Sequence, residues 1–197
     1  MKRRTWIKII IAAILVLIVY SSVKNTYNKM VTLRNQVESQ WSNVENVYQR
    51  RADLIPNLVE TVKGYAEHER ETFTQVTEAR SKAGQVSINP ENLSAEQLQQ
   101  FQQAQSQLSS ALSRLMVVVE RYPQLKASQN FQTLQAQLEG TENRIAVERR
   151  KFNETARQYN TYIEQFPRKL YANMFGFERK PYFEAEEGAE QAPEVNF

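Results

Sequence analysis

Side chains that could support metal or acid–base chemistry are scarce in this chain of 197 residues, which has one histidine, His68, and no cysteine. Zinc-protease sites need two histidines on one helix, and di-iron bundles need two Glu-x-x-His motifs. A single histidine cannot build either site, so we expect no metal and no cofactor. His68 lies in a run of charged residues at 67–71, which is typical of a solvated helix face.

The glycines exclude several common catalytic motifs. The two that lie closest in sequence, Gly176 and Gly188, are too far apart for a P-loop, a dinucleotide-binding fingerprint or a nucleophile elbow. A Ser-His-carboxylate triad would have to use His68, and only the abundance of glutamate supports a hydrolase built on paired carboxylates. We therefore predict that the protein is not an enzyme.

Polar residues interrupt two of the apolar stripes described below, and they are the candidate site residues of the chain. The six residues are Arg51, Asp53 and Asn57 near Pro56, and Glu142, Arg144 and Glu148 near Gly140, with Thr141 beside them. Such clusters fit a buried ligand site, or a structural polar network that fixes helix register, as single polar residues do in coiled coils. We favour the network and expect Arg51→Ala to destabilise the fold rather than remove an activity.

Residues 97–113 form an uncharged polar stretch with seven glutamines and four serines. Helix faces that meet water usually carry charges. This face is either a neutral solvated surface or a contact with another helix, and Gln99, Gln103 and Gln107 are our candidate residues for a homo-oligomer contact.

The N-terminus predicts a membrane anchor. Residues 1–5 form a basic stub, and residues 6–23 form a candidate transmembrane helix in which Trp6, Lys8 and Tyr20 would lie at the membrane interface. The uncharged core, residues 9–20, also has the length of a signal-peptide core, but a good cleavage signature is missing after it. We therefore expect an uncleaved, single-pass membrane anchor.

Charges near the span predict its orientation. Four basic residues precede the core of the span and three follow it, so the positive-inside rule favours a cytoplasmic N-terminus and a bundle outside the cytoplasm. The three basic residues at 2–4 contribute a charge of +3, which is the net charge of the whole chain, so the charges of the remaining residues sum to zero. A nucleic-acid partner is not expected, because its binding needs a basic face.

Beyond the span, apolar residues recur at alternating steps of three and four, the pattern of helices that bury one side. Such stripes run from Met30 to Ile55, along residues 56–83, 98–122 and 131–166, and a short helix is expected at 168–175. We expect a break or a kink at Pro56, a helix end at Gly84 and a capping box at Ser94 and Gln97.

The predicted fold is all-α, with the N-terminal transmembrane helix followed by an elongated antiparallel bundle of about four long helices. Each stripe must be buried against another helix, and short connections favour antiparallel neighbours. The bundle is expected over residues 24–178. Residues 179–197 are expected to form an acidic, disordered tail, since residues 184–197 contain five glutamates and no basic residue.

Three blocks of sequence carry a resemblance to a known family. They are residues 48–69 (YQRRADLIPNLVETVKGYAEHE), residues 138–149 (LEGTENRIAVER), and the pair Tyr159-Asn160 through Phe166-Pro167 with Gly176-Phe177. Together the blocks resemble the LemA family of bacterial single-pass membrane proteins, and the resemblance covers residues 5–197. It implies a long helical domain on one membrane helix in the bacterial inner (cytoplasmic) membrane, without an established enzymatic activity. Relatives in magnetosome-forming bacteria are tied to the formation of membrane compartments.

Two functions remain open from the sequence. The first is a non-enzymatic structural protein that self-assembles at the bacterial membrane, and shapes it or scaffolds other proteins; the lipid bilayer and further copies of the chain would be its partners. The second is a helical adaptor or receptor that binds an unknown protein through its bundle or its acidic tail.

Overall fold

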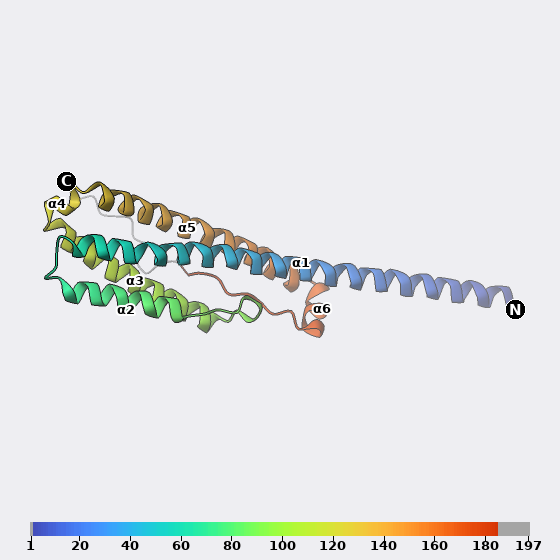
Figure 1. The fold of residues 1–197 in the computed structure, drawn as a ribbon. Helices are drawn as coiled ribbons and strands as arrows, with labels where there is room; N and C mark the ends of the chain where they lie inside the picture. The colour runs from blue at the N-terminus through green and yellow to red at the C-terminus, as the bar shows by residue number, and fades with distance from the viewer. Residues whose placement is uncertain (1, 185–197) are drawn as a thin grey trace, which may run out of the picture.

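One continuous helix joins the N-terminal apolar segment to the rest of the protein. The structure is a computed structural model that describes the backbone of residues 2–184 and the side chains of residues 6–184. Helix α1 spans Lys2–Lys63, and its 62 residues extend over about 93 Å at the usual rise per residue. Its N-terminal part projects alone from the other helices (Figure 1).

Of the break or kink expected at Pro56, the break does not occur, because Pro56 lies inside α1. Proline has no N–H to donate to the carbonyl of residue i−4, here Ala52, and an interior proline usually disrupts a helix. In this protein Arg80 replaces the missing donor, since its Nε donates to the Ala52 carbonyl at 2.7 Å. The chain turns instead between Lys63 and Arg70, where His68 is exposed in the connection rather than on a helix face.

Helix α2 (Arg70–Gln85) and helix α3 (Ala95–Glu120) are joined by a loop that contains the short 3-10 helix η1 (Pro90–Asn92). The helix end expected at Gly84 is wrong, because Gly84 lies within the last turn of α2. The capping box is confirmed: Ser94 accepts from the backbone N–H of Gln97, and Gln97 accepts from that of Ser94. Two orphan donors at the start of α3 are thereby satisfied.

The C-terminal half contains three further helices. The one-turn helix α4 (Pro123–Lys126) links α3 to α5 (Gln129–Glu164), which has 36 residues. Helix α6 (Arg168–Phe175) follows, and it ends at Gly176, whose φ of +72° places it in the left-handed region that favours glycine.

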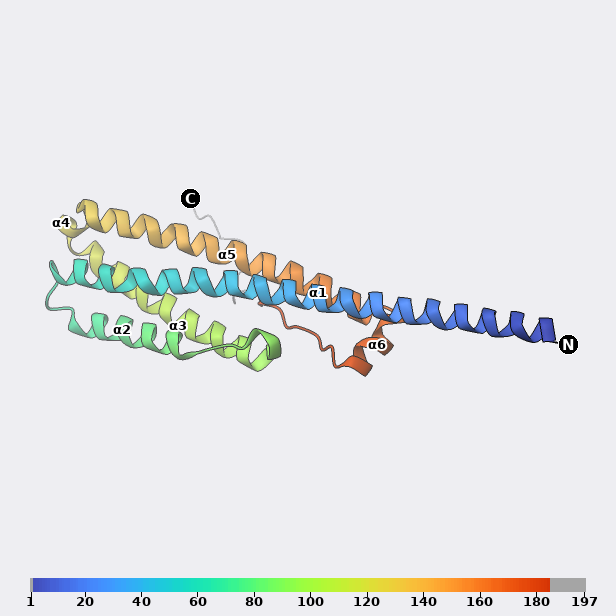
Figure 2. The same cartoon turned by 45° about the vertical axis from the view of Figure 1, so that its right-hand side comes forward.

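The long helices run alternately up and down the bundle. α1 pairs with α5, α2 pairs with α3, and the two pairs lie against each other (Figures 1 and 2). The turn from α1 to α2 and the α4 region lie at one end, which we call the distal end. The loop before α3 and α6 lie toward the other end, from which α1 projects. The described residues are helical without strands, so the predicted all-α bundle is confirmed.

Buried apolar residues form the core at the positions that the stripes predicted. The α1 stripe from Met30 to Ile55 is buried throughout, and the α3 stripe is buried from Leu98 to Val119. At the end of the α5 stripe, by contrast, Phe166 is exposed. Burying one side of each helix against its neighbours provides the main driving force for this bundle.

Packing of the chain continues beyond residue 178, where the bundle was expected to end. Residues 177–184, which we call the C-terminal strap, run back along the bundle, and Lys180 and Phe183 are both buried. The expected boundary of the tail at residue 179 is therefore corrected, because side chains of α5 bind the strap backbone, as described below. The expected disorder of residues 185–197 lies outside the described residues.

Candidate functional site

Arg51 lies at the centre of a buried polar layer. It occupies a core position of α1 and is only 2% exposed. Its Nη1 donates to Glu142 Oε1 at 2.7 Å and to Ser109 Oγ at 3.1 Å, and its Nη2 donates to Gln105 Oε1. The guanidinium also lies over the ring of Tyr48, 5.1 Å from its centroid. A buried charge needs such partners, since an unpaired one would be very costly.

Three helices place a polar residue at the same level of the bundle. Arg51 lies between two core residues of α1, Gln105 between two of α3 and Thr141 between two of α5. The buried apolar residues consequently form two clusters, one on each side of this layer. A polar layer of this kind penalises any shift of one helix along another, because a shift would leave Arg51 among apolar side chains.

The six residues proposed from the sequence do not all lie together. The structure brings Arg51 and Glu142 into contact, while Asp53, Asn57 and Arg144 are exposed. Asp53 accepts a hydrogen bond from Gln49 within α1. It follows Arg51 by two positions, a spacing that places the two side chains on different faces of the helix.

Glu148 forms a separate contact between α5 and α1. Gln40 Nε2 donates to Glu148 Oε2 at 2.7 Å, and Lys151 Nζ donates to its other oxygen at 2.7 Å. The hydrogen bond from Lys151 is the main cause that lowers the pKa of Glu148. Glu148 therefore joins α5 to α1 as a charged acceptor rather than as an acid.

Two members of the polar layer, Gln105 and Ser109, were missed from the sequence. Gln105 stood in the α3 stripe as its single polar position, and that was the available signal. Ser109 lies one turn later and carried no signal of its own. Their pairing with Arg51 depends on how α3 is rotated against α1, which the sequence pattern does not give.

The C-terminal strap is held by two asparagines of α5. Asn160 Oδ1 accepts from the backbone N–H of Lys180 at 2.9 Å, and its Nδ2 donates to the carbonyl of the same residue at 2.8 Å. Asn153 contacts Phe183 in the same way, at 2.8 and 2.9 Å. Each amide thus satisfies a backbone donor and acceptor that have no secondary-structure partner there.

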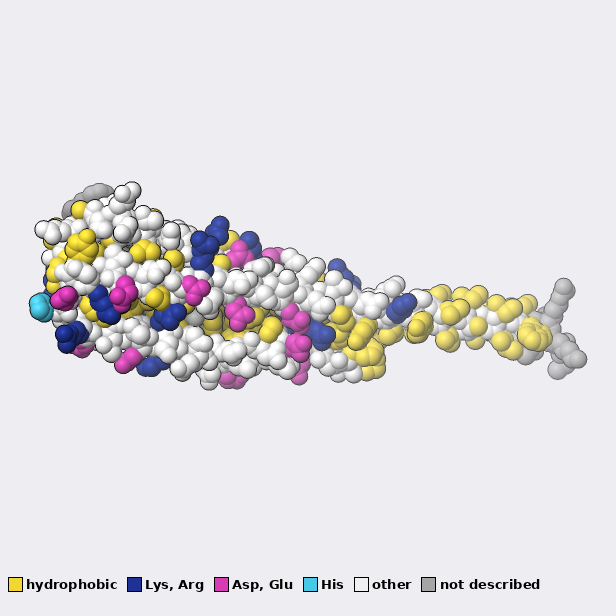
Figure 3. Space-filling model, viewed as in Figure 1, with side chains coloured by type: hydrophobic (Ala, Val, Ile, Leu, Met, Phe, Trp, Pro, Cys, Tyr) yellow, Lys and Arg dark blue, Asp and Glu magenta, His cyan; other side chains and the backbone are white. Residues whose placement is uncertain are grey.

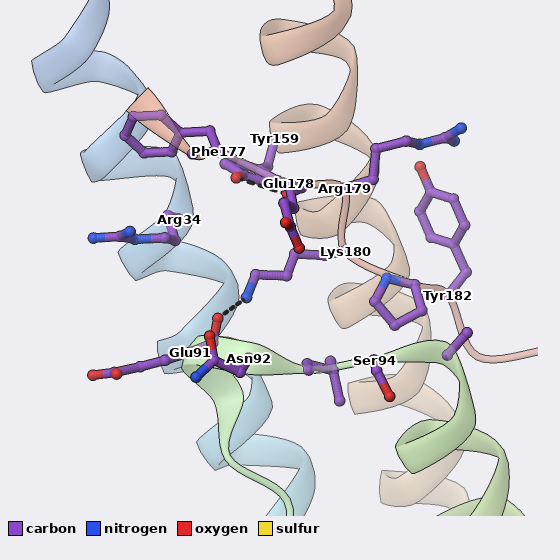
Figure 4. A pocket seen from close by; sticks show the side chains of 14 residues that line it. Arg34, Glu91, Asn92, Ser94, Tyr159, Phe177, Glu178, Arg179, Lys180 and Tyr182 are labelled. Carbon is purple, nitrogen blue, oxygen red and sulfur yellow. Dashed lines mark hydrogen bonds between the residues drawn. The ribbon is translucent and has the colours of Figure 1, made fainter. Parts of the chain in front are cut away.

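A polar cavity of about 520 Å³ lies beside the strap, between η1, α1 and α5 (Figure 4). Lys180 crosses it, and its Nζ donates to the carbonyls of Pro90 at 3.0 Å and Glu91 at 2.5 Å. Burial lowers the pKa of Lys180, the nearby Glu38 opposing this effect. The lysine therefore joins the strap to the loop before α3.

Tyr159 and Arg34 form another wall of this cavity (Figure 4). The Tyr159 hydroxyl donates to the Glu178 carbonyl at 2.9 Å, and burial raises its pKa to about 12. Arg34 lies over the Phe177 ring, 5.4 Å from its centroid. Both side chains contact the strap. A hydroxyl with a pKa of about 12 keeps its proton at neutral pH, so the arrangement suits a structural role better than acid–base chemistry.

Metal-binding groups of three or more His, Cys, Asp or Glu side chains are not found within residues 6–184. His68 lies at the distal tip, where the single histidine is visible in Figure 3.

Most of the N-terminal part of α1 is apolar and exposed (Figure 3). Within the described residues it is the one stretch long and apolar enough to cross a membrane, and none of it is buried by the rest of the protein. Trp6 and Tyr20 are both 65% exposed at the two ends of this stretch, and Lys8 is also exposed. Gln99, Gln103 and Gln107 are exposed on α3.

Comparison with known protein sequences shows to which family the chain is related. The LemA family profile matches residues 40–197. Magnetosome protein MamQ of Magnetospirillum gryphiswaldense is 29% identical over 174 residues, which cover 80% of this chain and 64% of the relative. Magnetosome protein MamQ 2 of Paramagnetospirillum magneticum is 29% identical over 175 residues, with the same coverage.

A second kind of relative is Protein LemA of Metamycoplasma hominis, which is 24% identical over 160 residues, covering 81% of this chain and 69% of the relative. The chain spans less than two thirds of the length of the two MamQ proteins. With the exposed apolar helix, these relatives indicate a membrane-associated protein. Because the family profile matches most of the sequence, the chain belongs to the LemA family.

Proposed function

We propose that this protein is a non-enzymatic structural protein that is anchored by α1 in the bacterial cytoplasmic membrane and self-assembles there through its bundle. In this proposal the bundle lies outside the cytoplasm, in agreement with the basic residues before the span. The assembly organises or shapes the membrane, or scaffolds other membrane proteins.

The observation that carries the proposal is the unbroken course of α1. The exposed apolar segment and the core stripe that begins at Met30 belong to one helix, without a glycine, a proline or a loop between them. A helix transmits orientation along its length far better than a flexible linker does. Contacts between bundles would therefore fix the spacing and the tilt of their spans in the lipid.

The exposed face of α3 supports a contact between copies. Its exposed residues include an uncharged ridge at alternating steps of four and three, the spacing that keeps residues on one side of a helix. The ridge consists of Gln99, Gln103, Ser106, Ser110, Ser113 and Val117. Val117, the last of them, is 67% exposed. Small and uncharged side chains allow a second helix to approach closely, and identical faces suit a symmetric interface.

The test measures the size of the full chain in nanodiscs, by mass photometry and negative-stain microscopy. Replacing Gln99, Gln103 and Gln107 together by Glu places like charges across a self-contact, which is unfavourable. We expect this variant to fall to smaller particles, while circular dichroism shows unchanged helix content.

The matched control replaces Gln36, Gln132 and Gln137 by Glu. These glutamines are also exposed, and the variant adds the same charge, but the positions are scattered over α1 and α5. The control should keep the particle size of the original protein. Equal sizes for the original protein and the α3 variant would contradict self-assembly through α3.

A further inference from the structure

Helix α6 presents an apolar side that no part of the described protein covers. Leu170 and Met174 lie one turn apart and are 61% and 64% exposed, and Phe166, just before the helix, is 83% exposed. The opposite side of α6 packs inward, where Ala172 is buried. A helix with one buried and one exposed apolar side is expected to bury the second side against something else.

The position of α6 indicates what covers it. The helix lies across the direction of α1 at the end of the bundle from which the apolar segment projects (Figures 1 and 2). It is fixed there because the Phe175 and Phe177 rings lie 5.1 and 5.6 Å from the ring of Tyr27. Tyr27 is four residues beyond Val23, the end of the expected span, or about 6 Å along the helix.

The charges on this part of the protein suit a lipid surface. Helix α6 begins with Arg168 and Lys169 and contains no acidic residue, and α1 carries Lys24 and Lys29 on either side of Tyr27. Interfacial helices bury an apolar side at the boundary between headgroups and acyl chains and keep Lys and Arg near anionic headgroups. Figure 3 shows the apolar side chains gathered where the bundle meets the projecting helix.

We propose that α6 is a membrane-surface helix that docks Phe166, Leu170 and Met174 into the same bilayer that α1 crosses. The inference rests on the proposed anchoring by α1. With α1 across the membrane and α6 along its surface, the bundle would be attached at two points and held upright. The strap that follows Gly176 would connect this second attachment to the core.

The experiment uses the absence of cysteine, which allows single sites to be labelled in the full chain. An environment-sensitive fluorophore is attached to Met174→Cys, and the protein is reconstituted in nanodiscs of phosphatidylcholine and phosphatidylglycerol. Quenching is measured with aqueous iodide and with lipid brominated near the headgroup end of its chains. Tyr65→Cys is the control, since Tyr65 is also exposed, at 46%, and lies in the turn at the distal end, outside the α3 ridge. Ile14→Cys reports on the anchor.

We expect the label at Met174 to be quenched by brominated lipid and protected from iodide, and the label at Tyr65 to show the reverse. A label at Met174 that iodide reaches as easily as it reaches Tyr65 would overturn the inference. Protection from both quenchers would also overturn it, since a second copy or another protein would then cover α6. If iodide reaches the label at Ile14, the anchoring by α1 fails, and with it the proposed function. A lipid-buried Ile14 with an accessible Met174 would overturn the α6 inference alone.

Discussion

Arg51 shows how a single charged residue can be accommodated in an apolar bundle. The side chain is nearly fully buried, and it reaches one carboxylate, one amide and one hydroxyl on two other helices. Its carboxylate partner, Glu142, is 44% exposed, so water screens the ion pair and reduces its contribution. The stabilising role of Arg51 therefore rests largely on packing and on satisfying Gln105 and Ser109, which would otherwise lose a hydrogen-bond partner in the core.

Replacing Arg51 by Ala should destabilise the protein by about 2–4 kcal/mol, because it leaves a cavity and removes three hydrogen bonds at once. Thermal unfolding in detergent, followed by circular dichroism, measures the change. Arg50→Ala is the control, since Arg50 is exposed on the same turn, and its effect should stay within about 0.5 kcal/mol. If Arg51→Ala kept the original Tm and lost a cellular phenotype, the layer would be a ligand site rather than a structural network.

Ionisation of the Tyr159 hydroxyl makes the free energy of unfolding depend on pH in the alkaline range. Its folded-state pKa is raised from 10.0 to about 12 by burial, so the folded state holds this proton more tightly than the unfolded state. The stabilisation is fully present below pH 10 and is lost as the pH rises to about 12. A difference of this size between the folded-state and unfolded-state pKa contributes at most about 2–3 kcal/mol to the free energy of unfolding.

Tyr159→Phe should therefore flatten the loss of stability between pH 10 and 12, as measured by urea unfolding at several pH values. Below pH 10 the variant should be less stable by about 1 kcal/mol, because the hydrogen bond to the Glu178 carbonyl is lost. Lys180 lies in the same cavity, and its lowered pKa acts in the opposite direction. The comparison must therefore be made between the two proteins at each pH. Parallel pH curves would contradict the assigned role of Tyr159.

At the scale of elements, α1 and α2 depend on each other at Pro56. The proline deprives the Ala52 carbonyl of its helical donor, and Arg80 of α2 supplies the replacement at 2.7 Å. The donor is charged, which makes the hydrogen bond stronger than a neutral one. The bond also connects the two helices that flank the distal turn.

A double-mutant cycle at Pro56 and Arg80 tests this dependence. Arg80→Ala should cost about 1–3 kcal/mol in the original protein, since the Ala52 carbonyl loses its partner. In the Pro56→Ala background the same change should cost less, because residue 56 then has an N–H for that carbonyl. Urea unfolding of the four proteins gives the coupling energy. Equal costs in both backgrounds would show that Arg80 acts independently of the proline.

The C-terminal strap is an extended segment that helix α5 holds in place through its side chains. Residues 177–184 have no helix or strand of their own, and Asn153 and Asn160 of α5 supply the hydrogen bonds that regular structure would give. The two asparagines lie seven residues, and therefore two turns, apart on the same side of α5. An extended chain can thus lie along a helix without a neighbouring strand.

At the scale of the whole molecule, the protein is a bundle on a projecting apolar helix. The apolar segment is covered by nothing in the described protein, whereas the stripe that follows it is buried. Lipid is a suitable environment for the first part, since an exposed helix of this composition is unfavourable in water.

Replacing Ile14 by Arg should weaken retention in the membrane, because a charge near the centre of a span costs about 3 kcal/mol on insertion. We expect carbonate washing to extract more of this variant than of the original protein. Val117→Arg makes the same change at an exposed apolar residue of the bundle, and it should be retained fully. Equal retention of both variants would indicate that the segment around Ile14 does not anchor the protein.

The amino-acid sequence by itself determined the helical class, the apolar segment, the buried stripes and the capping box at Ser94, because all of these depend on spacing within one helix or on one turn of backbone. It also indicated Arg51 as a polar residue at a core position. It could not show that Arg51 contacts Gln105 and Ser109, nor that Glu148 would lie elsewhere, since such contacts depend on the rotation and register of neighbouring helices.

Only the tertiary structure decided the course of the chain at Pro56 and at the C-terminal strap. Local propensity predicts a break at a proline, but Arg80, which lies 24 residues beyond Pro56, supplies a donor for the carbonyl that the proline leaves without one. Composition predicts a loose tail from residue 179, but asparagines of α5 bind the backbone of Lys180 and Phe183. In both cases the hydrogen bonds join residues distant in sequence, so no local pattern reveals them.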